Sequence, residues 1–101
     1  MAADTRLFRT WLHSHEEDHD GITVYRPAGF PFPPARGRRG LELRPDGGAV
    51  EYAIGRNDVD VARPGSWRES APGRITIHRG TGPRLRVVRV DDELLEVEED
   101  T

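Results

Sequence analysis

The clearest β-hairpin in this chain lies at residues 40–54, which read GLELRPDGGAVEYAI. Its centre, residues 45–48, combines proline and aspartate, which favour a turn, with glycines that adopt positive φ without strain. The runs on either side are rich in residues that fit a pleated strand. The stretch therefore predicts two antiparallel strands joined by a tight turn, and similar patterns recur outward from it in both directions.

Another hairpin is predicted on the N-terminal side of residues 40–54. Residues 11–17 alternate with a period of two, which puts one set of side chains on a single strand face: Trp11, His13, His15 and Glu17. Turn-forming residues 18–21 then lead into the β-rich run 22–26. Ahead of both, Asp4 or Thr5 is placed to cap a short N-terminal helical turn.

Four more strands are predicted after the hairpin of residues 40–54. A polar loop at residues 55–64 is followed by short β-type runs at 65–69, 74–78, 84–90 and 94–98. The alternation slips at Val87 and Val88, which indicates a β-bulge. Eight short strands without a helix long enough for a parallel crossover predict an all-β antiparallel meander. We expect it to close into one single-domain, eight-stranded barrel over residues 1–101, with an open half-barrel or a two-sheet sandwich as the alternative.

The composition limits the chemistry available to the chain. Cysteine is absent and all 15 basic residues are arginine, which excludes disulfides, thiolate metal sites and lysine-based catalysis. No apolar run is long enough to span a bilayer, and the first residues lack a secretory apolar region. We therefore expect a cytoplasmic protein that does not interact with membranes.

Three motifs carry a family resemblance: a tryptophan at the start of the first strand in residues 9–11, the segment 41–47, and Gly65-Ser66-Trp67 followed by residues 74–77. Together they resemble the lipocalin-like (calycin) group, specifically its short bacterial single-domain members. Arg9 replaces the glycine of the lipocalin Gly-x-Trp pattern, and Arg86 or Arg89 resembles the late arginine that covers the tryptophan. The resemblance implies a barrel for small apolar or amphipathic ligands, although some lipocalin-like barrels are cyclases or isomerases.

Residues 25–40 combine aromatic rings, arginines and stiff backbone more densely than any other stretch. Four prolines exclude a helix and predict a rigid, ordered loop. Phe30, Phe32, Arg36, Arg38 and Arg39 are expected to close the mouth of the barrel. The rings would contact the apolar body of a ligand, and a guanidinium clamp of Arg36 and Arg39 would bind its carboxylate or phosphate. In the alternative interpretation, the two rings cap the barrel core and the arginines pair with the acidic first turn.

The lumen is expected to complete a ligand-binding site. Its predicted apolar and aromatic lining is Trp11, Leu41, Leu43, Tyr52, Trp67, Ile75, Ile77 and Val87. Polar selectivity is expected from His13 and Tyr25, together with the two loop arginines. The predicted ligand is a modest amphipathic or carboxylate-bearing small molecule, and no cofactor is expected.

Other functions remain open for the same barrel. A cofactor-independent isomerase or cyclase would use His13, Glu17 and Tyr25 as acid and base. A cupin-like metal site would use His13, His15 and His78, although the glutamate that follows the second histidine in the cupin motif is missing. A barrel with a filled core and a structural or partner-binding role is the remaining option.

Partners other than a small molecule are less clearly indicated. Residues 36–40, RGRRG, resemble an arginine- and glycine-rich RNA-contacting segment. The net charge of -3 and the absence of a second basic strand argue against nucleic acid, so no such partner is expected. A homodimer is left open.

Overall fold

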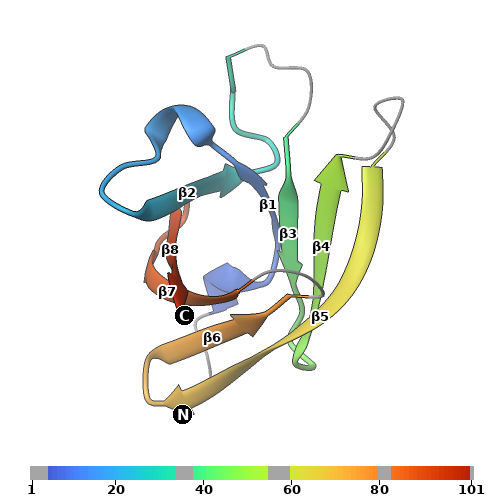
Figure 1. Ribbon diagram of the computed structural model, residues 1–101, viewed down its shortest axis with the longest axis vertical. Helices are drawn as coiled ribbons and strands as arrows, with labels where there is room; N and C mark the ends of the chain where they lie inside the picture. Colours follow the sequence, from blue (N-terminus) through green and yellow to red (C-terminus); the bar gives the residue numbers. More distant parts are fainter. Residues whose placement is uncertain (1–4, 34–37, 55–59, 80–82, 101) are drawn as a thin grey trace.

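The computed structural model describes residues 5–33, 38–54, 60–79 and 83–100. Within these ranges eight strands form a closed antiparallel barrel, which confirms the expected all-β fold (Figure 1). The elements in chain order are η1 (Thr5–Leu7), β1 (Thr10–His13), η2 (His15–Glu17), β2 (Ile22–Pro27), β3 (Gly40–Leu43), β4 (Gly48–Ile54), β5 (Asp60–Ala71), β6 (Arg74–His78), β7 (Arg84–Val90) and β8 (Leu95–Asp100).

The strand order is meander-like. Strands β3 to β8 lie side by side in sequence order, and the β1–β2 hairpin closes the barrel with β2 beside β8 and β1 beside β3. In this closure, Trp11 of β1 is opposite Leu41 of β3, and Tyr25 of β2 is opposite Leu95 of β8. Because each strand of the ring has two neighbours, the described sheet has no free edge.

Strand β5 is long because its two halves pair with different neighbours. Residues 60–66 pair with β4, and residues from Ser66 onward pair with β6, so that β5 curves around one side of the barrel (Figure 1). Gly65 lies at this change of partner, where a Cβ atom would be 2.4 Å from the carbonyl oxygen of His78. The predicted loop at 55–64 is wrong for residues 60–64, because β4 provides a partner strand despite their polar sequence and Pro64.

Strand β1 is shorter than predicted. It ends at His13, and His15–Glu17 form the 3-10 turn η2, so the single strand face proposed for residues 11–17 is wrong. The buried Ser14 donates its hydroxyl to the Glu17 carboxylate at 2.7 Å, and the Glu17 N–H donates to the Ser14 carbonyl at 2.9 Å. These local hydrogen bonds compete with strand pairing and end β1.

Strand β7 contains the predicted irregularity. Its pairing with β8 shifts between Val87 and Arg89, which confirms the β-bulge expected from the break in alternation. Val88, in the bulge, is the only large hydrophobic side chain of the described residues that is exposed. The bulge therefore interrupts the alternation of buried and exposed side chains that the rest of the barrel follows.

Apolar side chains fill most of the lumen. The buried cluster includes Trp11, Leu41, Leu43, Ile75, Ile77, Leu85, Leu95 and Val97. The expected N-terminal helical turn is confirmed as η1, which covers one end of the barrel and is visible through the ring of strands in Figure 1. There the indole N–H of Trp11 donates to the Leu7 carbonyl at 3.1 Å. We call this end the closed end.

Candidate functional site

A small polar cavity lies at the other end of the barrel, which we call the mouth. Its volume is about 120 Å³, and it is lined by His13, Thr23, Tyr25, Arg39, Gly40, Leu41, Glu51, Arg79, Leu85 and Glu99. β1 leads away from η1 and ends at His13, which places the mouth opposite the closed end. The structure thus brings together four residues of the predicted site: His13, Tyr25, Arg39 and Leu41.

An ion pair between Arg79 and Glu51 lies in the wall of the mouth. The Arg79 guanidinium is 3.4 Å from the Glu51 carboxylate, and the two side chains are only 14% and 16% exposed. Nε of Arg79 also donates to the Pro83 carbonyl at 2.9 Å, which fixes the direction of the guanidinium. The mouth therefore contains a preorientated and partly desolvated cation.

Tyr25 contributes a neutral hydroxyl to the mouth. Burial raises the pKa of Tyr25 to about 12, so that the group remains a hydrogen-bond donor throughout the neutral range. Its ring lies 5.6 Å from the ring of His13, whose Nε2 is 2.8 Å from the Asp18 carboxylate. Within the described residues the Tyr25 hydroxyl has no hydrogen-bond partner, and its oxygen is not fully buried. It is therefore available to a molecule in the cavity.

Arg39 provides a second cation at the rim. Its carbonyl accepts a hydrogen bond from the His13 N–H at 2.8 Å, which anchors its backbone beside the cavity. Its side chain is exposed and forms no ion pair with another described residue. Arg36, the other arginine predicted to bind a ligand, lies outside the described residues.

Glu51 and Arg79 were missed by the sequence analysis. Both are in phase with residues predicted to face the lumen: Arg79 follows Ile75 and Ile77 at steps of two, and Glu51 is opposite Leu41 in the β3–β4 register. Extending the alternation of the apolar positions by one step would have placed both charges inside the barrel. Because Glu51 and Arg79 are charged, their sequence alone indicated positions exposed to solvent.

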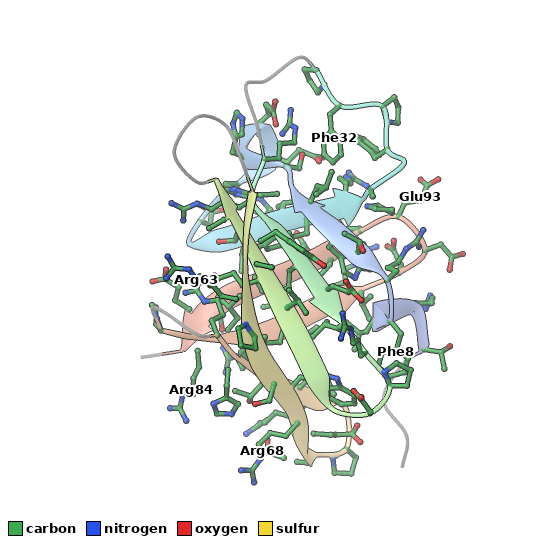
Figure 2. The ribbon with its side chains drawn as sticks, turned by 90° about the vertical axis from the view of Figure 1, so that its right-hand side faces the viewer. Phe8, Phe32, Arg63, Arg68, Arg84 and Glu93 are labelled. Carbon is green, nitrogen blue, oxygen red and sulfur yellow. The ribbon has the colours of Figure 1, made fainter. Side chains whose placement is uncertain are left out.

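Phe30 and Phe32 do not line the mouth. The rings are 5.1 Å apart, and each packs against a guanidinium carbon, with Arg26 4.9 Å from the Phe30 centroid and Arg38 4.3 Å from that of Phe32. Both arginines form double hydrogen bonds of 2.7 to 2.8 Å with carboxylates of η2, Arg26 with Glu17 and Arg38 with Glu16. The loop is thus attached to the acidic first turn, and Figure 2 shows Phe32 away from the barrel core.

These contacts also determine the state of Glu17. Hydrogen bonds from Arg26, and then from Ser14, lower the pKa of Glu17 to about 2. A carboxylate that is ionised and saturated with donors is a weak proton acceptor. Because Glu17 also does not line the mouth, the geometry gives no support to an isomerase or cyclase with Glu17 as its base.

One residue predicted to line the lumen lies elsewhere, and another packs against the core at the closed end of the lumen. Tyr52 is on the outer face of β4, because its neighbour Glu51 points inward, and its hydroxyl donates to Glu42 at 2.8 Å. Its predicted place in the lumen is therefore wrong. Trp67 is partly buried at the closed end, where its ring is 5.5 Å from that of Phe8 and its N–H donates to the Arg44 carbonyl at 2.6 Å.

The three candidate metal ligands are dispersed. The rings of His13 and His15 are 6.0 Å apart, but His78 is on the outer face of β6, because the neighbouring Ile77 is buried in the core. In the part of the chain that the structure describes, no group of three or more histidine, aspartate or glutamate side chains is arranged to bind a metal ion. The geometry does not favour the cupin-like alternative.

Together, the fold and the mouth define a closed eight-stranded β-barrel with a filled lumen and a polar cavity at one end. Comparisons with protein-family models, curated proteins and solved structures found no match. The barrel architecture is compatible with a lipocalin-like fold. In the described ranges, no helix has the length and apolar character needed to cross a membrane.

Proposed function

We propose that this protein is a small lipocalin-like barrel that binds a small carboxylate-bearing molecule at its mouth. The assignment to the bacterial, cytoplasmic calycins is part of the proposal and rests on the sequence resemblance and composition. The binding role rests on the mouth itself, whose lining combines two arginines, two carboxylates (Glu51 and Glu99), a hydroxyl donor and apolar walls in one small space.

The size of the cavity supports a ligand of only a few non-hydrogen atoms. Its volume of about 120 Å³ is well below the roughly 300 to 1,000 Å³ of pockets for drug-sized molecules. Trp11 and the other buried side chains occupy the lumen beneath it. Leu41 and Leu85 line one part of the cavity and provide contacts for a short apolar tail. A short-chain carboxylate fits this combination better than a long amphipathic ligand.

The observation that carries the proposal is that Arg39 and Tyr25 line the same cavity. Among the described residues, the Arg39 guanidinium has no ion-pair partner and the Tyr25 hydroxyl has no hydrogen-bond partner. A carboxylate accepts two hydrogen bonds from a guanidinium in a planar fork and has further lone pairs for a hydroxyl donor. Arg79 adds positive potential behind the ligand, although Glu51 already neutralises part of it. Binding at this position would give both donors a partner.

Isothermal titration calorimetry with linear carboxylates of increasing length, from acetate to octanoate, tests the proposal at neutral pH. We expect affinity to pass through a maximum at a short chain length, because a longer tail meets the filled lumen. Arg39→Gln should weaken binding by roughly 10- to 100-fold, the equivalent of one charge-assisted hydrogen bond. Arg89→Gln, which removes an exposed arginine paired with Asp91, is the control.

Two results would contradict the proposal: no heat with any carboxylate, or equal affinities for the wild-type protein and Arg39→Gln. The first would favour the filled, structural barrel that the sequence analysis left open. A tight complex with octanoate would show that the lumen opens beyond this cavity.

A further inference from the structure

An arginine-rich groove lies on the outer face of β5, β6 and β7. It has a volume of about 450 Å³, and its principal lining is Arg68, Arg74, Arg84, Arg86, Thr76 and His78. The groove and the mouth are separate, because Ile75 and Ile77 of β6 are buried in the core while the residues between them face outward. No residue of the groove is part of the lining of the mouth.

The sheet fixes the spacing of the charges in this groove. Thr76 in the central strand is opposite Arg68 of β5 on one side and Arg86 of β7 on the other. With adjacent strands about 4.8 Å apart, the backbones of these two arginines are separated by roughly 10 Å. Arg84 lies two residues along β7 from Arg86, a step of about 7 Å. The guanidinium groups thus form a two-dimensional array on a rigid support.

Most of this positive charge is not neutralised by neighbouring side chains. Arg86 forms an ion pair with Glu98, and Arg84 is opposite Asp100 in the β7–β8 register. Among the described residues, Arg68, Arg74 and Arg84 form no ion pair with an acidic side chain. In Figure 2, Arg68 and Arg84 project from the lower part of the barrel, away from its core. Elsewhere, arginines such as Arg26, Arg38 and Arg79 are paired with carboxylates. The groove is therefore a local cationic surface on a chain of net charge -3.

The chemistry of the groove favours a phosphate-bearing partner over a protein surface. Protein interfaces usually depend on buried aromatic or aliphatic anchors, and among the described residues Val88, at 49%, is the only exposed large hydrophobic side chain. By contrast, arginine forks and the hydroxyls of Ser70 and Thr76 are groups that contact nucleic-acid phosphates. No phenylalanine, tyrosine or tryptophan lines the groove, so bases have no ring to stack on.

We propose that this groove binds a nucleic-acid strand through its backbone phosphates, independently of base sequence. In the linear sequence, the net charge of -3 and the absence of a second basic strand argue against nucleic acid. The folded sheet provides that surface, because arginines from β5, β6 and β7 lie at outward-facing positions of neighbouring strands. The residues 36–40 that prompted the question are not needed for it.

Fluorescence anisotropy with a labelled single-stranded oligonucleotide tests the inference, with a duplex of equal length as a second probe. Contacts with about three phosphates predict a slope of log affinity against log salt of about -2, or a roughly twentyfold loss between about 50 and about 200 mM salt. The double variant Arg68→Gln/Arg84→Gln should have a shallower slope, between 0 and about -1. Both side chains are exposed and without a described partner, so the double variant should fold normally.

Arg44→Gln/Arg89→Gln, which removes two exposed arginines outside the groove, is the control for the same change in net charge and should retain the wild-type slope. Binding of either the single strand or the duplex with these dependences supports the inference. It is overturned if neither probe binds, if the double variant binds like the wild-type protein, or if polyglutamate binds while both oligonucleotides do not. The last result would assign the groove to an acidic protein.

Discussion

At the closed end of the barrel the lumen is sealed by apolar packing, whereas at the mouth it is lined by charges and hydroxyls. Trp11 and Leu7 are 0% and 1% exposed, and the one polar group of Trp11 is hydrogen-bonded to a carbonyl. At the mouth, Arg79, Glu51 and the Tyr25 hydroxyl occupy corresponding inward positions. The same ring of strands therefore supports two environments of opposite polarity.

This difference indicates a division of roles between the two ends. Apolar burial at the closed end stabilises the fold in proportion to the area removed from water. Polar groups in the mouth contribute less to folding, because their desolvation offsets much of their mutual attraction. Substitutions at the closed end should mainly change stability, and substitutions at the mouth should mainly change binding.

The largest effect is expected for Trp11→Ala. This substitution removes the largest fully buried side chain and its hydrogen bond to Leu7, and leaves a cavity beneath η1. We expect the free energy of unfolding to fall by about 3 to 5 kcal/mol, measured by guanidinium denaturation. A loss below about 1 kcal/mol would show that the closed end is not the main source of stability.

A smaller loss is expected for Gly65→Ala, in the strand that connects the two ends. The added methyl group would be 2.4 Å from the His78 carbonyl oxygen, so the β5 backbone must shift away from β6. Overpacking of this kind costs about 1 to 3 kcal/mol. Gly29→Ala, where no atom lies within 4 Å of the new Cβ, is the matched control. Equal stabilities of the two variants would refute the close approach at the bend.

The sequence was informative wherever local alternation decides the structure. The turn of residues 45–48, the number of strands and the bulge after Val87 all followed from patterns of neighbouring residues, whereas the bounds of β1 and β5 did not. The early end of β1 was missed because Ser14 and Glu17 form a local side-chain contact that strand periodicity does not report.

The contacts within the mouth and the groove were out of reach for a different reason. Arg79 and Glu51 are separated by 28 positions in the chain. They come into contact only because the closed barrel turns both side chains toward its lumen. Arg68, Arg74 and Arg84 lie on three strands and share a face only once the register is known. Sequence patterns give the phase of each strand, but the pairing of strands determines which charges become neighbours.

Acid should weaken the attachment of η2 beside the mouth. Arg26 and Ser14 lower the pKa of Glu17 to about 2 from an ordinary value of 4.5. This contribution to stability is therefore present above about pH 4.5 and is lost as the pH falls toward 2. Solvent screening limits it to roughly 1 kcal/mol, because the carboxylate is 37% exposed. The measurement is urea denaturation of the wild-type protein and Glu17→Gln at several acidic pH values.

Glu17→Gln should lose less stability on acidification than the wild-type protein, because it has no carboxylate to protonate at this position. Glu93→Gln, which removes an exposed carboxylate in the β7–β8 connection, should follow the wild-type curve. If all three proteins show the same dependence on pH, the ion pair does not contribute measurably to the fold.

The smallest effect on stability is expected for Tyr25→Phe. The hydroxyl that this substitution removes has no hydrogen-bond partner among the described residues, so the free energy of unfolding should change by less than about 0.5 kcal/mol. Affinity for a short-chain carboxylate should nevertheless fall by roughly tenfold, as expected for a lost donor of about 1.4 kcal/mol. A large loss of stability with unchanged affinity would reverse the role assigned to the mouth.

The most direct test of the binding site is a two-dimensional ¹H–¹⁵N NMR titration of the wild-type protein with butyrate. We expect saturable shifts in the backbone signals of His13 and Tyr25 and in the side-chain Nε signals of Arg39 and Arg79. Signals from Leu7, Trp11 and Trp67 at the closed end should remain unchanged. Shifts at the closed end, or saturation without any change at the mouth, would contradict this expectation.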